Sequence, residues 1–254
     1  MIELLGLPYS PWTEKAKWAL DVRQVPYRYR FYQPLVGEPA LRAKTGRWRG
    51  RVTVPVLTDD TGRVHTDSAD IARFADEHGT AEGARLFPGD ASAEIAEWVA
   101  RSERVLDAGR VLSLHRTLES PEALRELVPR GLRSALGGLA TTVGRFGVER
   151  TLRKYGGRER TLAESERTVR EGLDALRAAI ARSEAPSSPK TILARFTFAD
   201  IAAAQMLAFV TPPSFGLKLG KASRAGFTHP ALAAAYPDLL AWRDAIYEAH
   251  RPRT

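Results

Sequence analysis

The stretch that most constrains how this chain can fold is L-P-Y-S-P-W-T-E-K-A-K-W-A-L, from Leu7 to Leu20. The apolar run Ile2–Leu7 ends at a proline, which is typical of a short buried strand. Apolar residues then recur at helical spacing from Pro11 to Arg23, and a helix tolerates proline well at its first position. The sequence therefore predicts a strand that turns at once into a helix, with Ser10 at the corner.

Ser10 has two interpretations at this corner. The first turn of a helix leaves backbone N–H groups unpaired and carries the positive end of the helix dipole. A serine there can simply cap the helix, or it can help to hold an anion such as a thiolate, phosphate or carboxylate. No histidine lies near Ser10 in the sequence and the motif G-x-S-x-G is absent, which argues against a serine hydrolase.

Strands and helices continue to alternate up to about residue 80. The aromatic, alternating segment Tyr27–Tyr32 predicts a second strand, and Leu41–Arg51 is either helix or loop. Val52–Leu57 and Gly62–His65 are typical of a hairpin, and Asp67–His78 predicts a helix that ends before a glycine. We expect residues 1–80 to form one domain in the order β-α-β-α-β-β-α.

Two further places in this first domain are candidates for ligand binding. Pro55 lies just inside an apolar strand, where a proline marks an edge or a bend. A cis Val54–Pro55 bond would turn the backbone of Val54 outward, ready to pair with an extended peptide, but a trans proline at a strand start agrees equally well with the sequence. Asp67 and Ser68 could hold the charged ends of a ligand at a helix start, or simply cap that helix.

The remainder of the chain predicts helices. We expect a linker over residues 81–90 and an all-helical domain over residues 91–254. Helical periodicity is found in Ala91–Ser113, Pro121–Phe146, Thr161–Ser183, Phe198–Phe209 and Pro237–His250. Thr197 and Asp200 have the spacing of a capping box, which we interpret as a folding feature.

The composition excludes several classes of chemistry. The chain has no cysteine, so any thiol chemistry must use the thiol of a ligand. Its five histidines show no metal-ligand spacing, and we expect no metal site. No apolar stretch approaches the roughly 20 residues that span a bilayer, and the start does not have the pattern of a signal peptide. We therefore expect a cytoplasmic protein.

Positive charge is concentrated in the middle of the chain. Residues 130–160 hold eight basic and two acidic residues, and so account for most of the net charge of +8. An apolar stripe runs through the same segment at Leu132, Leu136, Leu139, Val143 and Phe146. This indicates either a helix whose glycines allow close packing, or a surface helix that turns Arg133, Arg145 and Arg150 toward anionic lipid or ligand. No nucleic-acid-binding motif is found.

Taken together, the order and spacing of these motifs resemble the cytosolic glutathione transferase family in its serine-type form. The resemblance rests on S-P-W-T-E-K-A-K-W-A-L, V-P-V-L, D-S-A-D-I-A-R-F, F-T-F-A-D-I and Y-P-D-L-L-A-W-R-D-A-I. It covers most of the chain and is weakest between about Arg116 and Arg160. It implies a thioredoxin-like domain followed by an all-helical domain.

The resemblance also implies roles for particular residues. Ser10 falls where the family has its catalytic serine, and Tyr9 is the alternative, because some serine-type relatives have that residue one place earlier. Val54, ahead of a cis Pro55, would pair with the cysteinyl backbone of glutathione. Asp67 and Ser68 would bind the γ-glutamyl end of glutathione, and Trp12 would line the acceptor pocket.

We therefore expect an enzyme that activates the glutathione thiol for attack on a small hydrophobic electrophile, in conjugation, isomerisation or dehalogenation. Glutathione would be a co-substrate, and the resemblance implies a homodimer. The alternative is a binding protein without activity that holds an apolar or anionic ligand.

Overall fold

The computed structural model describes residues 1–34, 36–82, 85–156 and 160–253 of the chain. Four short strands form one sheet in the order β2-β1-β3-β4. They are β1 (Glu3–Gly6), β2 (Arg28–Phe31), β3 (Val56–Thr58) and β4 (Val64–His65). β1 and β2 are parallel, whereas β3 pairs antiparallel with both β1 and β4.

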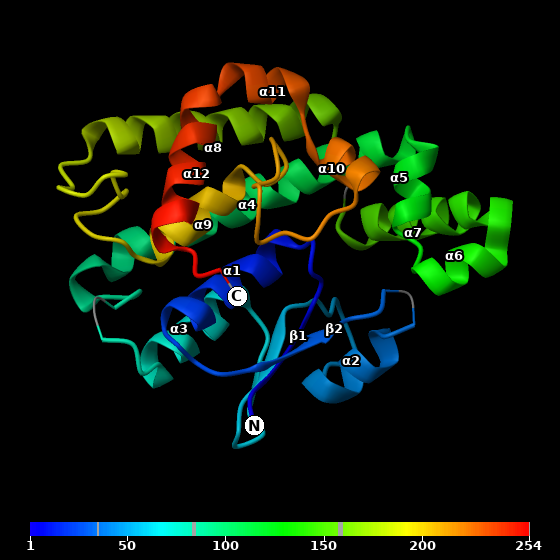
Figure 1. Cartoon of the computed structure of the whole chain (residues 1–254), viewed down its shortest axis with the longest axis horizontal. Coiled ribbons are helices and arrows are strands. Elements are labelled where there is room, and N and C mark those ends of the chain that lie inside the picture. The colour runs from blue at the N-terminus through cyan, green and yellow to red at the C-terminus, as the bar shows by residue number, and fades with distance from the viewer. Residues whose placement is uncertain (35, 83–84, 157–159, 254) are drawn as a thin grey trace.

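Three helices complete the first domain: α1 (Pro11–Val22), α2 (Glu38–Thr45) and α3 (Ser68–His78). The predicted order β-α-β-α-β-β-α is confirmed, and Leu41–Arg51, for which both helix and loop were open, begins as the end of α2. In Figure 1, α1 and α3 lie between the sheet and the helices of the second half. One apolar core runs through these layers, from Leu4 of β1 and Trp18 of α1 to Ile201 in the second half.

The turn from β1 into α1 depends on the small residues Gly6, Ser10 and Thr13. Ser10 is the N-cap of α1 and Pro11 is its first residue, as predicted. The hydroxyl of Thr13 accepts a hydrogen bond from the Leu7 N–H at 3.2 Å. A Cβ atom on Gly6 would come within 2.5 Å of the Thr13 side chain. The helix can therefore begin this close to the strand only because residue 6 is glycine.

The second half is helical, with α4 packed against α8 and α9. Thr197 and Asp200 form the predicted capping box at the start of α9. The helices are α4 (Ser92–Leu118), α5 (Pro121–Glu126), α6 (Arg130–Leu136), α7 (Ala140–Lys154), α8 (Leu162–Arg182), α9 (Phe198–Met206), α10 (Lys221–Phe227), α11 (Pro230–Ala235) and α12 (Pro237–His250), with 3-10 turns at Gly89–Ala91 and Gly137–Leu139.

The expected helical stretch Pro121–Phe146 is interrupted, which corrects the sequence prediction. It is divided into α5, α6, a 3-10 turn and the first half of α7. Pro129 precedes α6, and Gly137 ends it with a φ of 53°, in the left-handed region that favours glycine. The short helices α10 and α11 were not predicted.

The apolar stripe in this segment is not buried, so the packed-helix interpretation is wrong for it. Leu132, Leu139 and Phe146 are 49%, 65% and 54% exposed. The same interpretation is right at Gly144, where a Cβ atom would lie 2.1 Å from the Leu124 carbonyl oxygen of α5. Arg158 lies outside the described residues.

In the surface-helix interpretation Arg133, Arg145 and Arg150 face a lipid or ligand, but the structure gives each of them a partner inside the protein. Arg133 donates to the backbone carbonyls of Glu126 and Val128, so it caps the end of α5 instead. Arg145 donates to the Leu118 carbonyl at 3.1 Å and stays exposed.

The described residues contain no candidate for a membrane-spanning helix or for a metal site. Within them, no helix is both long enough and apolar enough to cross a bilayer. No three His, Asp or Glu side chains in the described ranges are grouped so that they could hold a metal ion.

Candidate functional site

The sheet brings the candidate residues of the first domain to one edge. Ser10 follows the carboxyl end of β1. Because β3 runs antiparallel to β1 with Val56 opposite Leu5, Val54 lies beside that same end. β4 runs antiparallel to β3 and hence in the direction of β1, so Asp67, which follows β4, also lies at this edge. A ligand placed here would pass from the start of α1, across the Val54 backbone, to the start of α3.

Ser10 is placed so that its hydroxyl proton is available. Its Oγ accepts a long hydrogen bond of 3.5 Å from the Thr13 N–H, the geometry of a helix cap. Among the described residues its O–H has no acceptor, and the side chain is only partly buried. The hydroxyl can thus accept from the helix and still donate to an anion at the positive end of α1.

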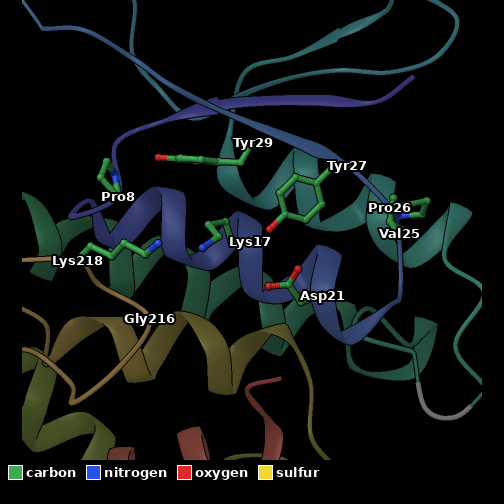
Figure 2. Close-up of a pocket in the computed structure, with 9 residues that line it drawn as sticks. All are labelled: Pro8, Lys17, Asp21, Val25, Pro26, Tyr27, Tyr29, Gly216 and Lys218. Carbon is green, nitrogen blue, oxygen red and sulfur yellow. The ribbon is translucent and has the colours of Figure 1, made fainter. Parts of the chain in front are cut away.

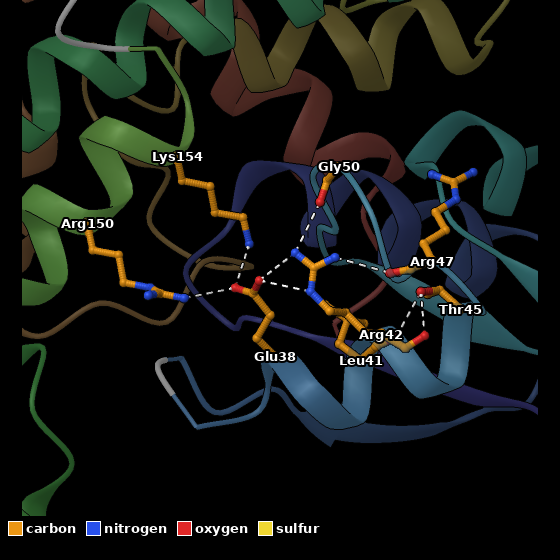
Figure 3. Close-up of polar contacts among 8 residues, drawn as sticks. All are labelled: Glu38, Leu41, Arg42, Thr45, Arg47, Gly50, Arg150 and Lys154. Atoms are coloured by element: carbon orange, nitrogen blue, oxygen red, sulfur yellow. Dashed lines mark hydrogen bonds and ion pairs between the residues drawn. The ribbon is translucent and has the colours of Figure 1, made fainter.

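The Val54–Pro55 peptide bond is cis, as one of the two interpretations expected. The backbone N–H and C=O of Val54 make no hydrogen bond with the described residues. They are therefore free to pair with another extended backbone. The approach to this bond is held from α2, since Arg42 donates to the carbonyls of Arg47 at 3.2 Å and Gly50 at 3.1 Å (Figure 3).

At the start of α3, Asp67 and Ser68 behave differently. Asp67 caps the helix, accepting from the Ala69 N–H at 2.8 Å. Ser68 is 2% exposed, and its hydroxyl has no hydrogen-bond partner among the described residues. A buried hydroxyl without a partner costs about 1–3 kcal/mol, so it indicates a position where a ligand group belongs. His65 holds this turn in place, with its ring nitrogens 3.3 Å from Asp59 and 3.4 Å from Asp70.

Tyr9 lies at the same corner but in a different environment. Burial raises the pKa of its phenol to about 12, and the nearby phenols of Tyr32 and Tyr155 add to the shift. The group is therefore protonated at neutral pH and can act as a hydrogen-bond donor. Tyr9 and Ser10 remain alternative donors at this site.

Trp12 faces the second half of the molecule. Its Nε1–H donates to Glu103 of α4 at 2.6 Å, and its ring centroid lies 6.4 Å from that of Phe209. Lys15, one turn further along α1, donates to the other oxygen of Glu103. This side of α1 is thus fixed to α4 by one carboxylate that serves two donors.

Sequence reasoning missed two residues beside Trp12. The Arg110 guanidinium lies 4.5 Å from the centre of the Trp12 ring and 3.6 Å from that of Tyr155. It pairs with Asp107 but its buried Nε has no partner among the described residues, and burial lowers its pKa. Arg110 follows Glu103 by seven residues on one helix, and this spacing places both residues on the same face. The sequence could therefore have predicted that Arg110 lies near Glu103.

A second junction joins the two halves at α2. Glu38 accepts from Arg42 on its own helix at 2.8 Å, and from Arg150 and Lys154 of α7 at 3.2 Å and 3.3 Å (Figure 3). The hydrogen bond from Arg42 is the largest cause that lowers the pKa of Glu38 to about 2. The sequence did not predict this contact either, because Glu38 and its partners on α7 are more than a hundred residues apart.

Comparison with protein families gives two matches. The family model described as "Glutathione S-transferase, N-terminal domain" matches residues 9–78, and the one described as "Glutathione S-transferase, C-terminal domain" matches residues 159–245. The first match includes all the site residues that the sequence predicted, from Tyr9 to Ser68. A comparison with curated proteins gives no match.

Several solved structures share the fold along the full chain. A glutathione transferase, GSTFuA2 from Phanerochaete chrysosporium, is 18% identical with a TM-score of 0.67, covering 100% of this chain and 99% of that chain. A family member from Pseudomonas fluorescens Pf-5 with bound glutathione is 21% identical with a TM-score of 0.59, and both chains are covered to 100%. A glutathione S-transferase from Methylobacterium radiotolerans in complex with glutathione sulfonate is 17% identical with a TM-score of 0.56, with 100% and 95% covered.

Proposed function

Since this chain belongs to the glutathione S-transferase family, we propose that it is an enzyme that binds glutathione and activates its thiol for attack on a small hydrophobic electrophile. The observation that carries the proposal is the edge where the capping hydroxyl of Ser10, the free backbone of Val54 and the unpartnered hydroxyl of Ser68 lie together. Structures of the same fold contain bound glutathione, which supports this choice of thiol.

Each part of the edge has a proposed partner on glutathione. The sulfur lies at Ser10, the cysteinyl backbone pairs with Val54 ahead of the cis Pro55, and the γ-glutamyl end reaches Asp67 and Ser68. Arg42 has no part in this arrangement, because its guanidinium is already used by Glu38 and the carbonyls before Val54.

The proposed chemistry is stabilisation of a thiolate. Ser10 donates its proton in a hydrogen bond to the sulfur while its oxygen accepts from Thr13, and the dipole of α1 adds to the effect. Lowering a thiol pKa by two units corresponds to about 2.7 kcal/mol, which a hydrogen bond to a charge together with a dipole can supply. The thiol proton passes to solvent. The sulfur then forms a bond to the electrophilic carbon, and in a displacement the leaving group departs with its electron pair.

The acceptor is proposed to lie where α1, α4 and α7 meet. The rings of Trp12 and Tyr155 lie there, both in contact with the Arg110 guanidinium. We also propose that the protein is a homodimer and is located in the cytoplasm. Light scattering of the purified protein tests whether it is a dimer.

The chain offers a matched control for testing Ser10. Ser120 is also an N-cap serine directly before a proline, and its Oγ accepts from the Ala123 N–H at 3.1 Å, far from the proposed site. We expect wild type and Ser120→Ala to bind glutathione in calorimetry and to turn over an aromatic halide or an activated alkene. Ser10→Ala should keep binding and lose at least about tenfold in kcat/KM.

Three results bear on the proposal in different ways. Equal losses in Ser10→Ala and Ser120→Ala would reduce Ser10 to a helix cap. A loss in Tyr9→Phe in place of Ser10→Ala would assign the donor to Tyr9. Glutathione binding without turnover of any electrophile would make the protein a binding protein, the alternative function.

A further inference from the structure

The junction of α1, α4 and α7 holds an arginine with an unused hydrogen-bond donor. The side chain of Arg110 on α4 is only 15% exposed, and its guanidinium lies against the rings of Trp12 and Tyr155. One end of the guanidinium donates to Asp107. Its Nε, however, has no hydrogen-bond partner among the described residues. A buried charged donor without an acceptor is costly, so this position favours an anion.

A second arginine reaches the same tyrosine from another part of the chain. The Arg51 guanidinium lies 5.4 Å from the centre of the Tyr155 ring. Its side chain is exposed and makes no ion pair or hydrogen bond with the described residues. Burial is the main cause that lowers the pKa of Arg110, and the positive charge of Arg51 adds to it. An anion bound by both guanidinium groups would relieve their repulsion.

The carboxylates of this junction are already engaged. Glu103 accepts from Trp12 and Lys15, and Asp107 pairs with Arg110. Among the described residues, three cations here meet two carboxylates: Lys15, Arg51 and Arg110 against Glu103 and Asp107. A ligand with one negative charge would balance them. A carboxylate has this charge, and its two oxygens match the planar donor fork of a guanidinium.

This cluster borders the corner that carries the proposed thiolate. Burial is the main cause that raises the pKa of Tyr9 to about 12, and the phenols of Tyr32 and Tyr155 add to it. Tyr155 therefore lies close to the residue before Ser10. Trp12, which also contacts Arg110, follows Ser10 by two residues. An electrophile whose charged group is held at Arg110 can thus turn its reacting carbon toward Ser10.

We propose that the electrophile is a small aromatic carboxylate, and that Arg110 and Arg51 determine this specificity, which rests on the proposed function. The carboxylate lies between the two guanidinium groups, and the aromatic body lies against the rings of Trp12 and Tyr155. With an aryl chloride, the glutathione sulfur forms a bond to the ring carbon that carries chlorine. Chloride leaves with the electron pair of the broken bond, and the carboxylate is unchanged.

Two substrates that differ in one negative charge, 4-chloro-3-nitrobenzoate and 4-chloro-3-nitrobenzamide, test this specificity. Each kcat/KM is divided by the rate of the uncatalysed reaction with glutathione, because the two rings differ in reactivity. We expect wild type to prefer the benzoate by at least about tenfold. In Arg51→Met and in Arg110→Met the preference should fall to within about threefold, through a higher KM for the benzoate.

Arg49→Met is the matched control. Arg49 is an exposed arginine two residues before Arg51, and its side chain makes no ion pair or ring contact with the described residues. Its preference for the benzoate should equal that of wild type. Because Arg51 is exposed, Arg51→Met gives a result even if the more buried Arg110→Met does not fold. Equal preferences in the variants of Arg49 and Arg51 would overturn the role of Arg51 and Arg110.

The outcomes distinguish a failure of this specificity from a failure of the proposed function. Turnover of both substrates without preference would overturn the specificity and leave the function standing. Weaker glutathione binding in Arg51→Met or Arg110→Met, measured by calorimetry, would assign these arginines to glutathione instead. Turnover of neither substrate would contradict the function. Calorimetry then decides, because the benzoate should still bind at least about tenfold more tightly than the benzamide, and equal affinities would overturn the anion site.

Discussion

Two lysines on α1, only two residues apart, have opposite surroundings. Lys15 is fully buried and is neutralised by Glu103 of α4, which also accepts from Trp12. Lys17 lies about 200° further around the helix, over a cavity of about 450 Å³ between α1, β2 and the loop after α9, and has no ion-pair partner among the described residues (Figure 2). A buried charge must be paired inside the fold, whereas a half-buried charge such as Lys17 keeps contact with water. The α4 side of α1 thus joins the two halves of the molecule through a charge pair, whereas the charge on the opposite side makes no such pair with the described residues.

The strongest test of this comparison is at the carboxyl end of the chain. Arg251 pairs with Glu14 at 2.7 Å and with Asp21 at 2.6 Å, all three nearly inaccessible to solvent. Arg251→Met would leave two buried carboxylates unpaired, and we expect it to lower the free energy of unfolding by about 4 kcal/mol in urea.

The pH dependence of the same variant gives a second readout. Burial raises the pKa of Glu14, and loss of Arg251 raises it further. A raised carboxyl pKa costs stability as pH rises above the unfolded value, so the loss in Arg251→Met should be larger near pH 7 than near pH 5. Arg253→Met is the control, because Arg253 and its partner Glu248 are 69% and 67% exposed. Equal losses in the two arginine variants would contradict the account.

The next effect concerns the α4 side. Glu103→Leu leaves the buried Lys15 ammonium without a partner, and we expect a loss of about 3 kcal/mol in the free energy of unfolding. Adding Lys15→Met removes the uncompensated charge, so the double variant should recover most of that loss. If the double variant were less stable than Glu103→Leu, charge pairing would not be the reason for this contact.

A smaller effect is expected where the pairing is nearer to solvent. Glu38→Gln removes the carboxylate that joins α2 to α7, and we expect a loss of about 1 kcal/mol at neutral pH. Because the pKa of Glu38 is lowered to about 2, its contribution is fully present above the unfolded value and disappears as pH falls toward 2. The difference between wild type and Glu38→Gln should therefore shrink from about pH 6 to about pH 3. A difference that stays constant would contradict this assignment.

The smallest effect is predicted on the cavity side. Lys17→Gln should change the free energy of unfolding by less than about 0.5 kcal/mol, because its ammonium makes no ion pair with the described residues and lies 5.6 Å from the centre of the Tyr29 ring. Thermal unfolding without ligand checks this. A loss as large as that of Glu103→Leu would mean that Lys17 has a structural partner, and the difference between the two sides of α1 would vanish.

Local signals made several helix starts predictable. Ser10 with Pro11, Asp67, and the pair Thr197 and Asp200 all make their capping contacts within three residues, so short patterns were enough to place the starts of α1, α3 and α9. The cis Val54–Pro55 bond was one of two interpretations that the sequence left open. These same signals brought the proposed glutathione residues to one edge.

The remaining features depend on partners far apart in the chain. Lys15 and Glu103 are 88 positions apart, and Glu14 and Arg251 are 237 apart, so no local pattern links them. The cavity likewise needs β2 and the loop after α9, which are brought together only by the packed fold. In the basic segment the stripe of leucines had helical spacing, but spacing alone does not say whether a neighbouring element covers it.

The central claim is that Ser10 stabilises the thiolate of bound glutathione, and an ultraviolet titration of the thiolate against pH tests it most directly. With wild-type protein and with Ser120→Ala, we predict that the thiolate absorbance of bound glutathione appears below pH 7. With Ser10→Ala, it should appear only near the pH at which free glutathione titrates, while glutathione still binds. A thiolate that persists below pH 7 in Ser10→Ala would contradict the account.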